Sequence, residues 1–357
     1  MYTSFKPGQL WLDTEGKPIQ AHGFSVKYDP HTRLYYWYGE NKEYTKAGGT
    51  VWHWGVRLYT SRDLYNWEDK GVIIPPAPDD LSDPLHPTYC MDRPHILYCP
   101  KTGKYVAWLK IMAGTVSQFM SVLVADRLDG PYTYVRRVHF PLGMDSGDFD
   151  LVYDEETGKG YIIFERPHFE LICATLTEDF TAAAEEYSTH FSGPHPPYTR
   201  EAPTFFTRGG KKYLLTSGTT GYFPNTTLVC SFDEFHGTYT DLGDACEGDT
   251  YHVSFNAQFT SVIRVPDTDL YIACADRWLP FENVEEKAEA TIREYEQIFR
   301  DYVPDTTPRT DPNPLSGRLT VCGSNTVESR YVWLPIRWDG DRPVITWHAE
   351  WRIEDFV

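Results

Sequence analysis

The chain has 357 residues, a formal net charge of −18 at pH 7 and an aromatic content of 15%, with 11 Trp and 25 Tyr. This length allows one large domain or two ordinary ones, and the excess of negative charge argues against nucleic acid or an anionic membrane as a partner. The aromatic content favours a β-rich protein and is typical of surfaces that stack on sugars.

The N-terminal stretch "MYTSFKPGQLWLD" has neither the basic nor the apolar region of a signal peptide. No apolar run approaches the ~20 residues needed to cross a bilayer. The seven Cys lack CxxC spacing, which predicts free buried thiols rather than a disulfide framework or a zinc site. We therefore expect a cytoplasmic protein.

Along the chain, one pattern occurs five times: a polar residue, a short apolar strand, a turn rich in Gly, Asp, Pro or Lys, and a second strand led by Tyr. The copies are "HGFSVKYDPHTRLYYWYGE" from His22, "DRPHILYCPKTGKYVAWLK" from Asp92, "GDFDLVYDEETGKGYIIFE" with Asp148, "EAPTFFTRGGKKYLLTSG" from Glu201 and "QFTSVIRVPDTDLYIACAD" from Gln258. The interval from the leading polar residue to this Tyr is 13 residues in four copies and 12 in the copy from Glu201. Each copy predicts a β-hairpin.

A second pattern follows several of these hairpins, in "GVRLYTSRDLYNWEDKG", "MSVLVADRLDGPYTYV" and "TLVCSFDEFHGTYTDL". It consists of a strand, a turn containing Asp and a further aromatic strand. Four strands per unit and five units predict an all-β fold, a single five-bladed β-propeller domain spanning residues 1–357. We expect "QLWLD" and "VITWHAEWRI", near the two ends of the chain, to complete one blade together.

Between "ADRW" and "SRYVWLPI" lies a stretch, about 279–328, that interrupts the last hairpin unit. Its segment "ENVEEKAEATIREYEQIFRDYV" has apolar residues at helical spacing and Glu/Lys pairs, and the proline-rich "PDTTPRTDPNP" that follows cannot continue a helix. We expect a helical insertion packed on the propeller rim. A cap on the funnel, a narrowing of its acceptor side or an oligomer contact are the alternatives.

The first strand of a propeller blade lines the central channel, so the residues that begin these strands converge at one mouth. His22, Asp92, Asp148, Glu201 and Gln258 hold equivalent positions, and all five are polar. Three carboxyl groups that face one another repel. Since this repulsion destabilises the folded protein, the three carboxyl groups favour a catalytic site over residues that only cap the ends of strands.

These stretches, together with "FNAQFTSVIRVP", "ADRW" and "SRYVWLPIRWDG", resemble glycoside hydrolase family 43, and most closely its exo-β-1,3-galactanase branch. The resemblance covers most of the chain from Trp11 to Trp351 and implies a five-bladed propeller that inverts the anomeric centre. It implies that Glu201 is the general acid, that Asp148 sets the pKa of this acid, and that Gln258 positions or activates the water. Inversion predicts that the acid and the water-activating group lie ~6.5–9.5 Å apart.

The base is left open by the sequence. Most of the family has Asp where this chain has His22, and His22 is the alternative to Gln258 as a base, although "AHG" in this branch looks like a structural and sugar-contacting element. Asp92 stands where the branch usually has Glu, so the terminal sugar can differ from galactose. A β-xylosidase, an α-L-arabinofuranosidase, a galactofuranosidase and a non-catalytic sugar-binding propeller are the alternative functions.

Further side chains suit a sugar site because they lie in loops or at strand ends, where polar groups can reach hydroxyls and aromatic faces can stack on pyranose rings. These candidates are Glu40, Trp52, Trp54, Tyr222, Arg277 and Trp278. The 12 His show no HxxxH or HExxH pattern, so we expect no cofactor and no catalytic metal. A structural Ca²⁺ near His252 is an alternative. The expected partner is an oligosaccharide, and the sequence does not indicate an oligomeric state.

Overall fold

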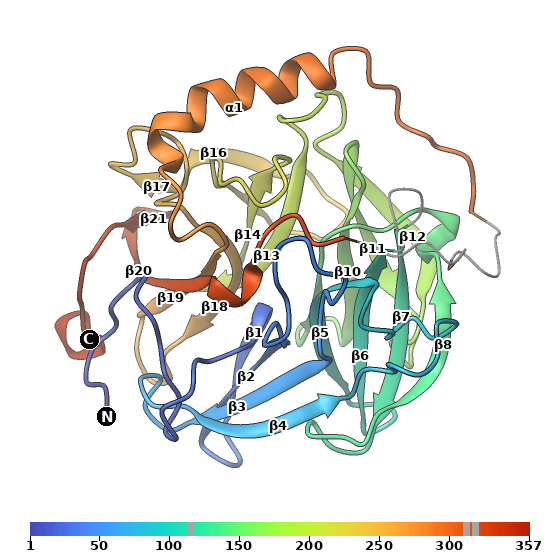
Figure 1. The fold of residues 1–357 in the computed structure, drawn as a ribbon, viewed down its shortest axis with the longest axis horizontal. Coiled ribbons are helices and arrows are strands. Elements are labelled where there is room, and N and C mark those ends of the chain that lie inside the picture. Colours follow the sequence, from blue (N-terminus) through green and yellow to red (C-terminus); the bar gives the residue numbers. More distant parts are fainter. Residues whose placement is uncertain (113–117, 310–314, 316–320) are drawn as a thin grey trace.

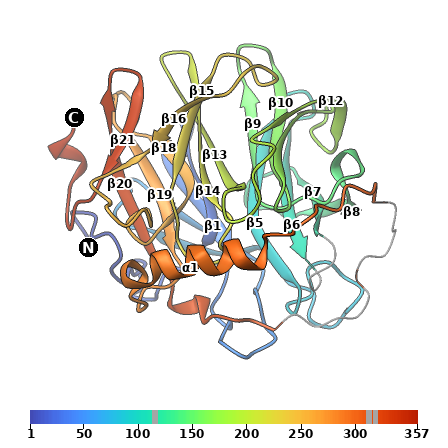
Figure 2. The same ribbon diagram turned by 90° about the horizontal axis from the view of Figure 1, so that it is seen from above.

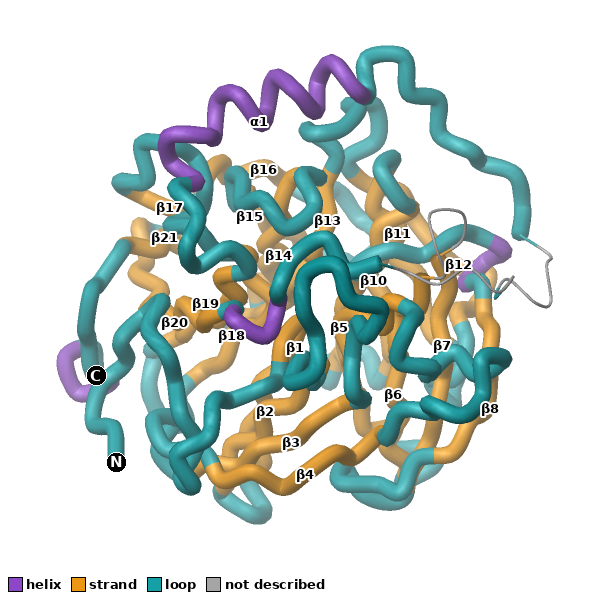
Figure 3. The backbone as a smooth tube through the Cα atoms, viewed as in Figure 1, coloured by secondary structure: helices purple, strands orange, loops and turns teal. Residues whose placement is uncertain are grey.

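The computed structural model describes residues 1–112, 118–309, 315 and 321–357. Five sheets stand around a central channel (Figures 1 and 3). The first blade contains β1 (His22–Asp29), β2 (Leu34–Glu40), β3 (Val56–Ser61) and β4 (Glu68–Ile74), and the second contains β5 (Cys90–Cys99), β6 (Lys104–Met112), β7 (Gln118–Ala125) and β8 (Thr133–His139). The third contains β9 (Phe149–Asp154), β10 (Lys159–Arg166), β11 (Glu170–Leu176) and β12 (Ala183–His190).

The fourth blade contains β13 (Arg200–Arg208), β14 (Lys211–Gly218), β15 (Leu228–Phe232) and β16 (Thr240–Asp244). The fifth has the order β18 (Gln258–Arg264), β19 (Tyr271–Arg277), β20 (Arg330–Asp339), β21 (Arg342–Thr346) and β17 (Cys246–Glu247), in which β17 pairs in parallel with β21. The inner strands β1, β5, β9, β13 and β18 contact one another in a closed ring. The predicted five-bladed propeller is confirmed.

Asp side chains close several of the predicted hairpin turns. Asp29 Oδ1 accepts a hydrogen bond from the backbone N–H of His31 at 2.9 Å, and Asp154 Oδ1 accepts one from the N–H of Glu156 at 3.3 Å. An Asp that bonds the backbone two residues later stabilises a turn by itself. These Asp side chains therefore stabilise the hairpin turns of the first and third blades.

The core consists of apolar clusters packed among the blades. Trp37 and Trp333 lie at the centre of the cluster that the first and fifth blades share, with ring centroids 4.8 Å apart. Aromatic rings bury large apolar areas and favour such tilted contacts. Some of the tryptophans therefore pack in the hydrophobic core, in addition to those expected at the sugar site that the sequence predicted.

The predicted pairing of "QLWLD" with the last strand is wrong. Leu12, within that stretch, forms an isolated bridge with Pro18, and β21 is the fourth strand of the fifth blade. The two ends of the chain pair instead through Phe5 and Trp351, whose backbones form two hydrogen bonds of 2.8 and 3.1 Å. A local turn satisfies residues 9–13, so they do not need a sheet partner.

In each blade, the link between the second and third strands returns to the end of the propeller where the inner strand begins. These links are residues 41–55, 113–117, 167–169, 219–227 and 278–329, of which 113–117, 310–314 and 316–320 lie outside the described residues. The last link is the predicted insertion and contains α1 (Val284–Ile298), at the same end of the propeller as the 41–55 link (Figure 2). Three 3-10 turns complete the fold: η1 (Pro141–Gly143), η2 (Thr326–Glu328) and η3 (Ile353–Asp355).

Among the described residues, α1 is the one α-helix, and it packs on the propeller rim as predicted (Figure 1). No helix in this part of the chain is long and apolar enough to cross a membrane. All seven Cys are free and buried, which confirms the expectation from their spacing.

Candidate active site

The residues that begin the inner strands are aimed by irregularities directly behind them. The pairing of β1, β5 and β13 with their neighbours shifts register after His22, Asp92 and Glu201. The next residue has a positive φ in each case: Gly23 (52°), Arg93 (46°) and Ala202 (51°). Bulges of this kind rotate a side chain away from the regular pleat and are common beside active sites.

A cavity of about 260 Å³ opens at this end of the propeller. Its lining contains Glu40, Trp52, Asp92, Arg93, Lys110, Met112, Gln118, Asp148, Glu165, His168, Glu201, Gly221, Tyr222, Gln258 and Trp278. The volume is slightly below the ~300–1,000 Å³ that is usual for small-molecule sites. The cavity therefore suits a short part of a chain rather than a long one.

The structure brings four of the five predicted strand-head residues into this cavity: Asp92, Asp148, Glu201 and Gln258. Of the three acidic residues in this stretch, Asp148, Asp150 and Asp154, only Asp148 lines the cavity. Asp150 Oδ2 instead accepts the backbone N–H of Phe205 at 2.8 Å, and Asp154 belongs to a turn.

Asp148 is held as an anion by two cations. Its Oδ2 lies 2.8 Å from Arg93 Nε, and its Oδ1 lies 2.9 Å from Lys110 Nζ. Burial opposes ionisation, but Arg93 and Lys110 outweigh it and keep the pKa of Asp148 below its ordinary value. The result is a fixed negative charge on the cavity wall.

Glu201 has a different environment. Within the described residues no Lys or Arg lies at salt-bridge distance from its carboxyl group, and its one side-chain hydrogen bond comes from Gln258 Nε2 at 3.2 Å. Burial, followed by the negative charges of Asp148 and Glu165, raises the pKa of Glu201 well above its ordinary value. A carboxyl group of this kind keeps its proton to a higher pH than an ordinary Glu and can act as a general acid.

Gln258 is fully engaged by its neighbours. Its Oε1 accepts hydrogen bonds from Arg93 Nη2 at 2.7 Å and Trp278 Nε1 at 3.1 Å, and its Nε2 donates to Glu201 Oε1 and to Ser217 Oγ at 3.0 Å. The opposite orientation of the amide would set two donors against Arg93 and Trp278, so the network fixes its direction. The 3.2 Å contact is also much shorter than the ~6.5–9.5 Å predicted between an acid and a water-activating group.

Asp92 is an ionised group of the cavity wall. It accepts hydrogen bonds from Trp52 Nε1 at 3.1 Å and from the thiol of Cys90 at 2.9 Å, and Lys110 Nζ lies 3.4 Å away. Burial opposes ionisation here as well, but Lys110 and Lys42 lower the pKa of Asp92 below its ordinary value.

Glu40 also lines the cavity, at the end of β2. Its Oε2 lies 2.6 Å from Lys42 Nζ and its Oε1 accepts the backbone N–H of Arg93 at 3.0 Å. Burial raises the pKa of Glu40 to about 8, against the opposing charge of Lys42. A side chain on Gly23 would come within 2.4 Å of Glu40 Oε1, so the glycine beside His22 makes room for this carboxyl group.

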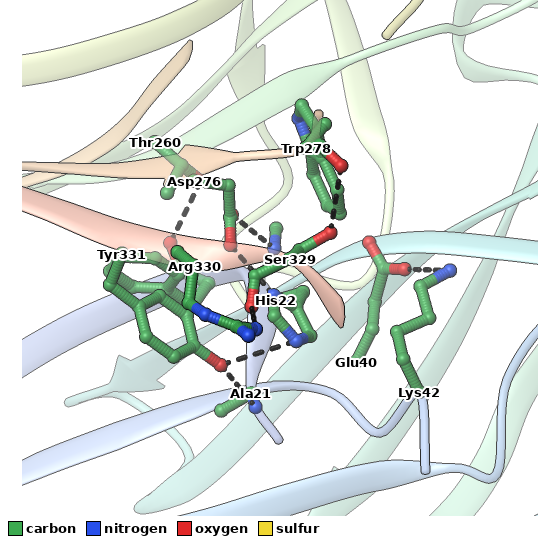
Figure 4. A network of polar contacts seen from close by, with 12 residues as sticks. Ala21, His22, Glu40, Lys42, Thr260, Asp276, Trp278, Ser329, Arg330 and Tyr331 are labelled. Atoms are coloured by element: carbon green, nitrogen blue, oxygen red, sulfur yellow. Dashed lines mark hydrogen bonds and ion pairs between the residues drawn. The ribbon is translucent and has the colours of Figure 1, made fainter. Parts of the chain in front are cut away.

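His22 does not reach the cavity, which corrects its prediction as a sugar contact and removes it as a candidate base. It is fully buried, its Nδ1 lies 2.8 Å from Asp276 Oδ1, and its Nε2 lies 3.3 Å from the hydroxyl of Tyr331 (Figure 4). Both ring nitrogens thus have partners inside the protein. The ring serves to join the first and fifth blades.

Two further candidates lie outside the cavity. Arg277 donates hydrogen bonds to the backbone oxygens of Phe255 and Asn256 and does not pair with Asp276. Trp54 packs edge-on against Tyr44, with ring centroids 4.9 Å apart. Tyr222 and Trp278 do line the cavity, and their rings lie 5.1 Å apart.

Sequence reasoning missed Arg93, Lys110, Glu165 and Lys42. The sequence did contain a signal for Lys110 and Glu165, because the residue opposite each strand head, on the second strand of the blade, is also polar. In the first, second, fourth and fifth blades these partners are Glu40, Lys110, Ser217 and Asp276, and in the third the N–H of Glu165 bonds the carbonyl of Asp148 at 2.8 Å. Side chains directly opposite on paired strands point to the same side, so a second ring of polar groups backs the first.

No cluster of His, Cys, Asp or Glu that could hold a metal ion occurs in the described part of the chain. His252 is exposed and lies 2.9 Å from Asp244 Oδ2. Glu40, Asp92 and Asp148 of the cavity pair with Lys42, Lys110 and Arg93.

Several solved structures are similar to this protein over almost its whole length. A family 43 β-1,3-galactosidase, BT0265, is 25% identical, with a TM-score of 0.78 over 100% of this chain, which spans 65% of the length of that protein. A second family 43 β-1,3-galactosidase, BT3683 with galactodeoxynojirimycin, is 24% identical over 98% of this chain and 100% of its own, with a TM-score of 0.76. An exo-β-1,3-galactanase from Phanerochaete chrysosporium with β-1,3-galactotriose is 21% identical over 99% of this chain and 68% of its own, with a TM-score of 0.75.

No curated protein sequence matches the chain. Residues 18–275, which include β1 through β18 and most of β19, match the model of glycosyl hydrolases family 43. The chain therefore belongs to glycosyl hydrolase family 43 and is a glycoside hydrolase.

Proposed function

We propose that this protein is an inverting exo-glycoside hydrolase that releases terminal galactose from β-1,3-linked galacto-oligosaccharides. The observation that carries the proposal is the contrast between two buried carboxyl groups in one cavity. Asp148 is paired with Arg93 and Lys110, whereas Glu201 has no cation partner among the described residues. Two titratable groups whose environments drive their pKa values apart are the usual basis for separate acid and anion roles.

In this mechanism Glu201 donates its proton to the glycosidic oxygen as the bond to the terminal sugar breaks. Asp148 stays ionised throughout and, after burial, helps to keep the pKa of Glu201 high. A fixed negative charge on the cavity wall also favours the positive charge that develops on a bound sugar ring. Arg93 contributes by holding Asp148 and Gln258 together through Nε and Nη2.

Gln258 is assigned to positioning the water rather than to accepting its proton. Both acceptor sites of its Oε1 are taken by Arg93 and Trp278, so the oxygen has no free lone pair for a water proton. Its Nε2 becomes available when an entering sugar breaks the contact with Glu201. The amide then donates a hydrogen bond to a water held on the far face of the sugar. This water adds to the anomeric carbon as the bond to the leaving oxygen breaks, and its surplus proton passes to solvent.

The choice of galactose rests on the related structures, which are β-1,3-galactosidases and exo-β-1,3-galactanases at 21–25% identity. The cavity volume of about 260 Å³ supports exo action, because it suits one terminal unit and the linkage to the next. Trp52, Tyr222 and Trp278 supply aromatic surfaces for that unit.

The test is sugar release by the purified protein from β-1,3-galactobiose and β-1,3-galactotriose, with xylo- and arabino-oligosaccharides alongside. We expect single galactose units, first in the anomeric form opposite to that of the substrate, as followed by NMR of the fresh product. Glu201→Gln should abolish release while retaining the fold. Release of a pentose in place of galactose would refute the sugar assignment, and undiminished activity of Glu201→Gln would refute the acid assignment.

A further inference from the structure

In the described part of the chain, the insertion follows the rim of the cavity end of the propeller from the fifth blade, past the fourth, to the third (Figure 3). It starts with Val284 and Ala288 packed on Val253. Next, Tyr198 in the link before the fourth blade donates a hydrogen bond to Glu296. Further along the insertion, the carbonyl of Thr306 accepts a hydrogen bond from Arg166 Nη2 of the third blade at 3.0 Å. Arg309 then forms an ion pair of 2.6 Å with Asp145, which lies in the link between the second and third blades. The last contact reaches the 41–55 link, where Cys322 and Gly49 share a backbone hydrogen bond of 2.9 Å.

Three aromatic residues of the insertion lie next to one another. Tyr295 lies in the last turn of α1, Phe299 is the residue that ends the helix, and Tyr302 follows in the turn after it. The rings of Tyr295 and Phe299 lie 6.0 Å apart and those of Phe299 and Tyr302 lie 5.6 Å apart. Tyr295 is near enough to Glu201 for that charge to contribute, after burial, to the raised pKa of its hydroxyl.

These rings contact the cavity wall through His168. The imidazole lies 5.6 Å from the ring of Phe299 and 6.3 Å from that of Tyr302, edge-on to both. The hydroxyl of Tyr302 also donates a hydrogen bond to the carbonyl of Pro167 at 3.3 Å. The insertion thus fixes the turn that connects β10 to β11.

Glu165 fixes the same turn from the other side. His168 has a left-handed backbone, with a φ of 59°, and its N–H donates to Glu165 Oε1 at 2.8 Å. Its Nδ1 lies 3.5 Å from the same oxygen. A conformation of this kind persists where the surroundings hold it, and it is common at ligand sites.

The exposure of the lining indicates which end of the cavity receives the rest of the substrate. The side chain of Asp148 is 9% exposed, whereas that of His168 is 40% exposed. The terminal sugar therefore fits among the buried groups. The next unit leaves the cavity along its open side, where His168 stands.

We propose that His168 contacts the leaving-group sugar, the unit next to the terminal one, and that Phe299 and Tyr302 of the insertion position its ring. The proposal rests on the proposed function, since it requires that Glu201 protonates the oxygen between the two units. His168 is then a specificity-determining residue for the acceptor side. The insertion acts on specificity through it, without touching the terminal sugar.

The test compares a substrate that has a leaving sugar with ligands that have none. For His168→Ala we expect kcat/KM on β-1,3-galactobiose to fall about tenfold, the equivalent of ~1.4 kcal/mol of lost contact. The kcat/KM on 4-nitrophenyl β-galactoside and the inhibition constant of free galactose should stay within about twofold. Phe299→Leu should produce a smaller loss on galactobiose alone.

Ile298→Ala is the matched control, because Ile298 adjoins Phe299 and is 64% exposed. It should leave all three values unchanged, and thermal melts of each variant show whether the fold is retained. Equal losses on both substrates in His168→Ala, or weaker binding of free galactose, would overturn the subsite and leave the proposed function intact. A wild-type protein that cleaves neither galactoside would overturn both.

Discussion

Gln258 Nε2 donates a hydrogen bond to Glu201 Oε1 at 3.2 Å, across the gap between the fifth and fourth blades. The contact joins the proposed acid to the proposed water-positioning group in the free protein. It also gives the acid a neutral partner in place of a cation. A neutral donor does far less than a Lys or Arg to favour the ionised form, so burial and nearby anions decide the pKa of Glu201.

Replacement of Gln258 by Glu tests this relationship. The new carboxylate would keep Arg93 and Trp278 as donors on one oxygen but would set its other oxygen against Glu201. A like charge at this distance raises the pKa of Glu201 further, so the alkaline limb of the kcat/KM profile should move to higher pH. A limb at the wild-type position would show that the two side chains are apart in solution.

Asp148→Asn should move the same limb in the opposite direction. Glu201 acts in its protonated form, so activity falls as the pH rises through its pKa, and this pKa is raised by burial first and by Asp148 second. Removal of the Asp148 charge also leaves Arg93 and Lys110 without their shared anion, which favours ionised Glu201. We expect the alkaline limb to shift down by about one pH unit or more.

Asp154→Asn is the control for this shift. Asp154 is the last residue of β9, outside the cavity, and its replacement also removes one negative charge. Its pH profile should coincide with that of the wild type. A downward shift of the limb in Asp154→Asn equal to that in Asp148→Asn would mean that net charge, rather than the local contact, sets the pKa.

Lys110 should matter strongly for stability. It is buried between Asp148 and Asp92, at 2.9 and 3.4 Å, so Lys110→Met leaves two buried carboxylates with less compensation. Loss of one member of a buried ion pair costs about 3–5 kcal/mol, which urea unfolding at pH 7 would measure. Lys104→Met, which breaks an exposed pair with Asp126, should cost less than about 1 kcal/mol.

The pH dependence of this effect has a definite sign. Burial favours the neutral form of Asp148 in the folded protein, but Arg93 and Lys110 outweigh it and keep the pKa of Asp148 below its ordinary value. The pair therefore stabilises the protein above the ordinary pKa of an Asp, and this contribution is lost as the pH falls through the folded pKa. The difference between wild type and Lys110→Met should narrow as the pH is lowered below about 4. A difference that widens in acid would contradict the assignment.

The fold was predictable because the period of the hairpin pattern is set by local chemistry. Asp29 and Asp154 close two of the turns within a few residues, and the spacing from strand head to Tyr is 13 residues in four copies and 12 in the fifth. That constant phase also predicted that Asp148, Glu201 and Gln258 meet in one cavity. The pairing of Phe5 with Trp351 had no such signal, because it depends on how two distant ends meet in space.

The surroundings of His22 could not be predicted from its position in the hairpin pattern. It begins its strand as the others do, yet Asp276 of the neighbouring blade lies 2.8 Å from its ring and the side chain remains buried. A sequence pattern gives the position of a residue along a strand but not the partner that a bulge turns it toward. Arg93 was missed for the same reason: its left-handed backbone points the guanidinium at Asp148 and Gln258 rather than along the strand.

Trp52→Phe tests the wall around Asp92. Trp52 Nε1 donates to Asp92 Oδ1 at 3.1 Å, and its ring lies 5.1 Å from Lys42 Nζ. Phe keeps an aromatic surface for the sugar and for Lys42 but removes the donor. Hydrogen bonds to charged groups contribute roughly 1.5–3 kcal/mol, so a substrate that depends on Asp92 in this position should lose about tenfold or more in kcat/KM.

Trp54→Phe is the matched comparison, since Trp54 lies two residues away in the same link and packs on Tyr44 outside the cavity. It should leave kcat/KM unchanged. If Trp54→Phe lowered kcat/KM as much as Trp52→Phe, the loss would come from the 41–55 link as a whole and the indole N–H of Trp52 would have no special part. A loss confined to Trp52→Phe would instead tie sugar binding to the direction in which Asp92 is held.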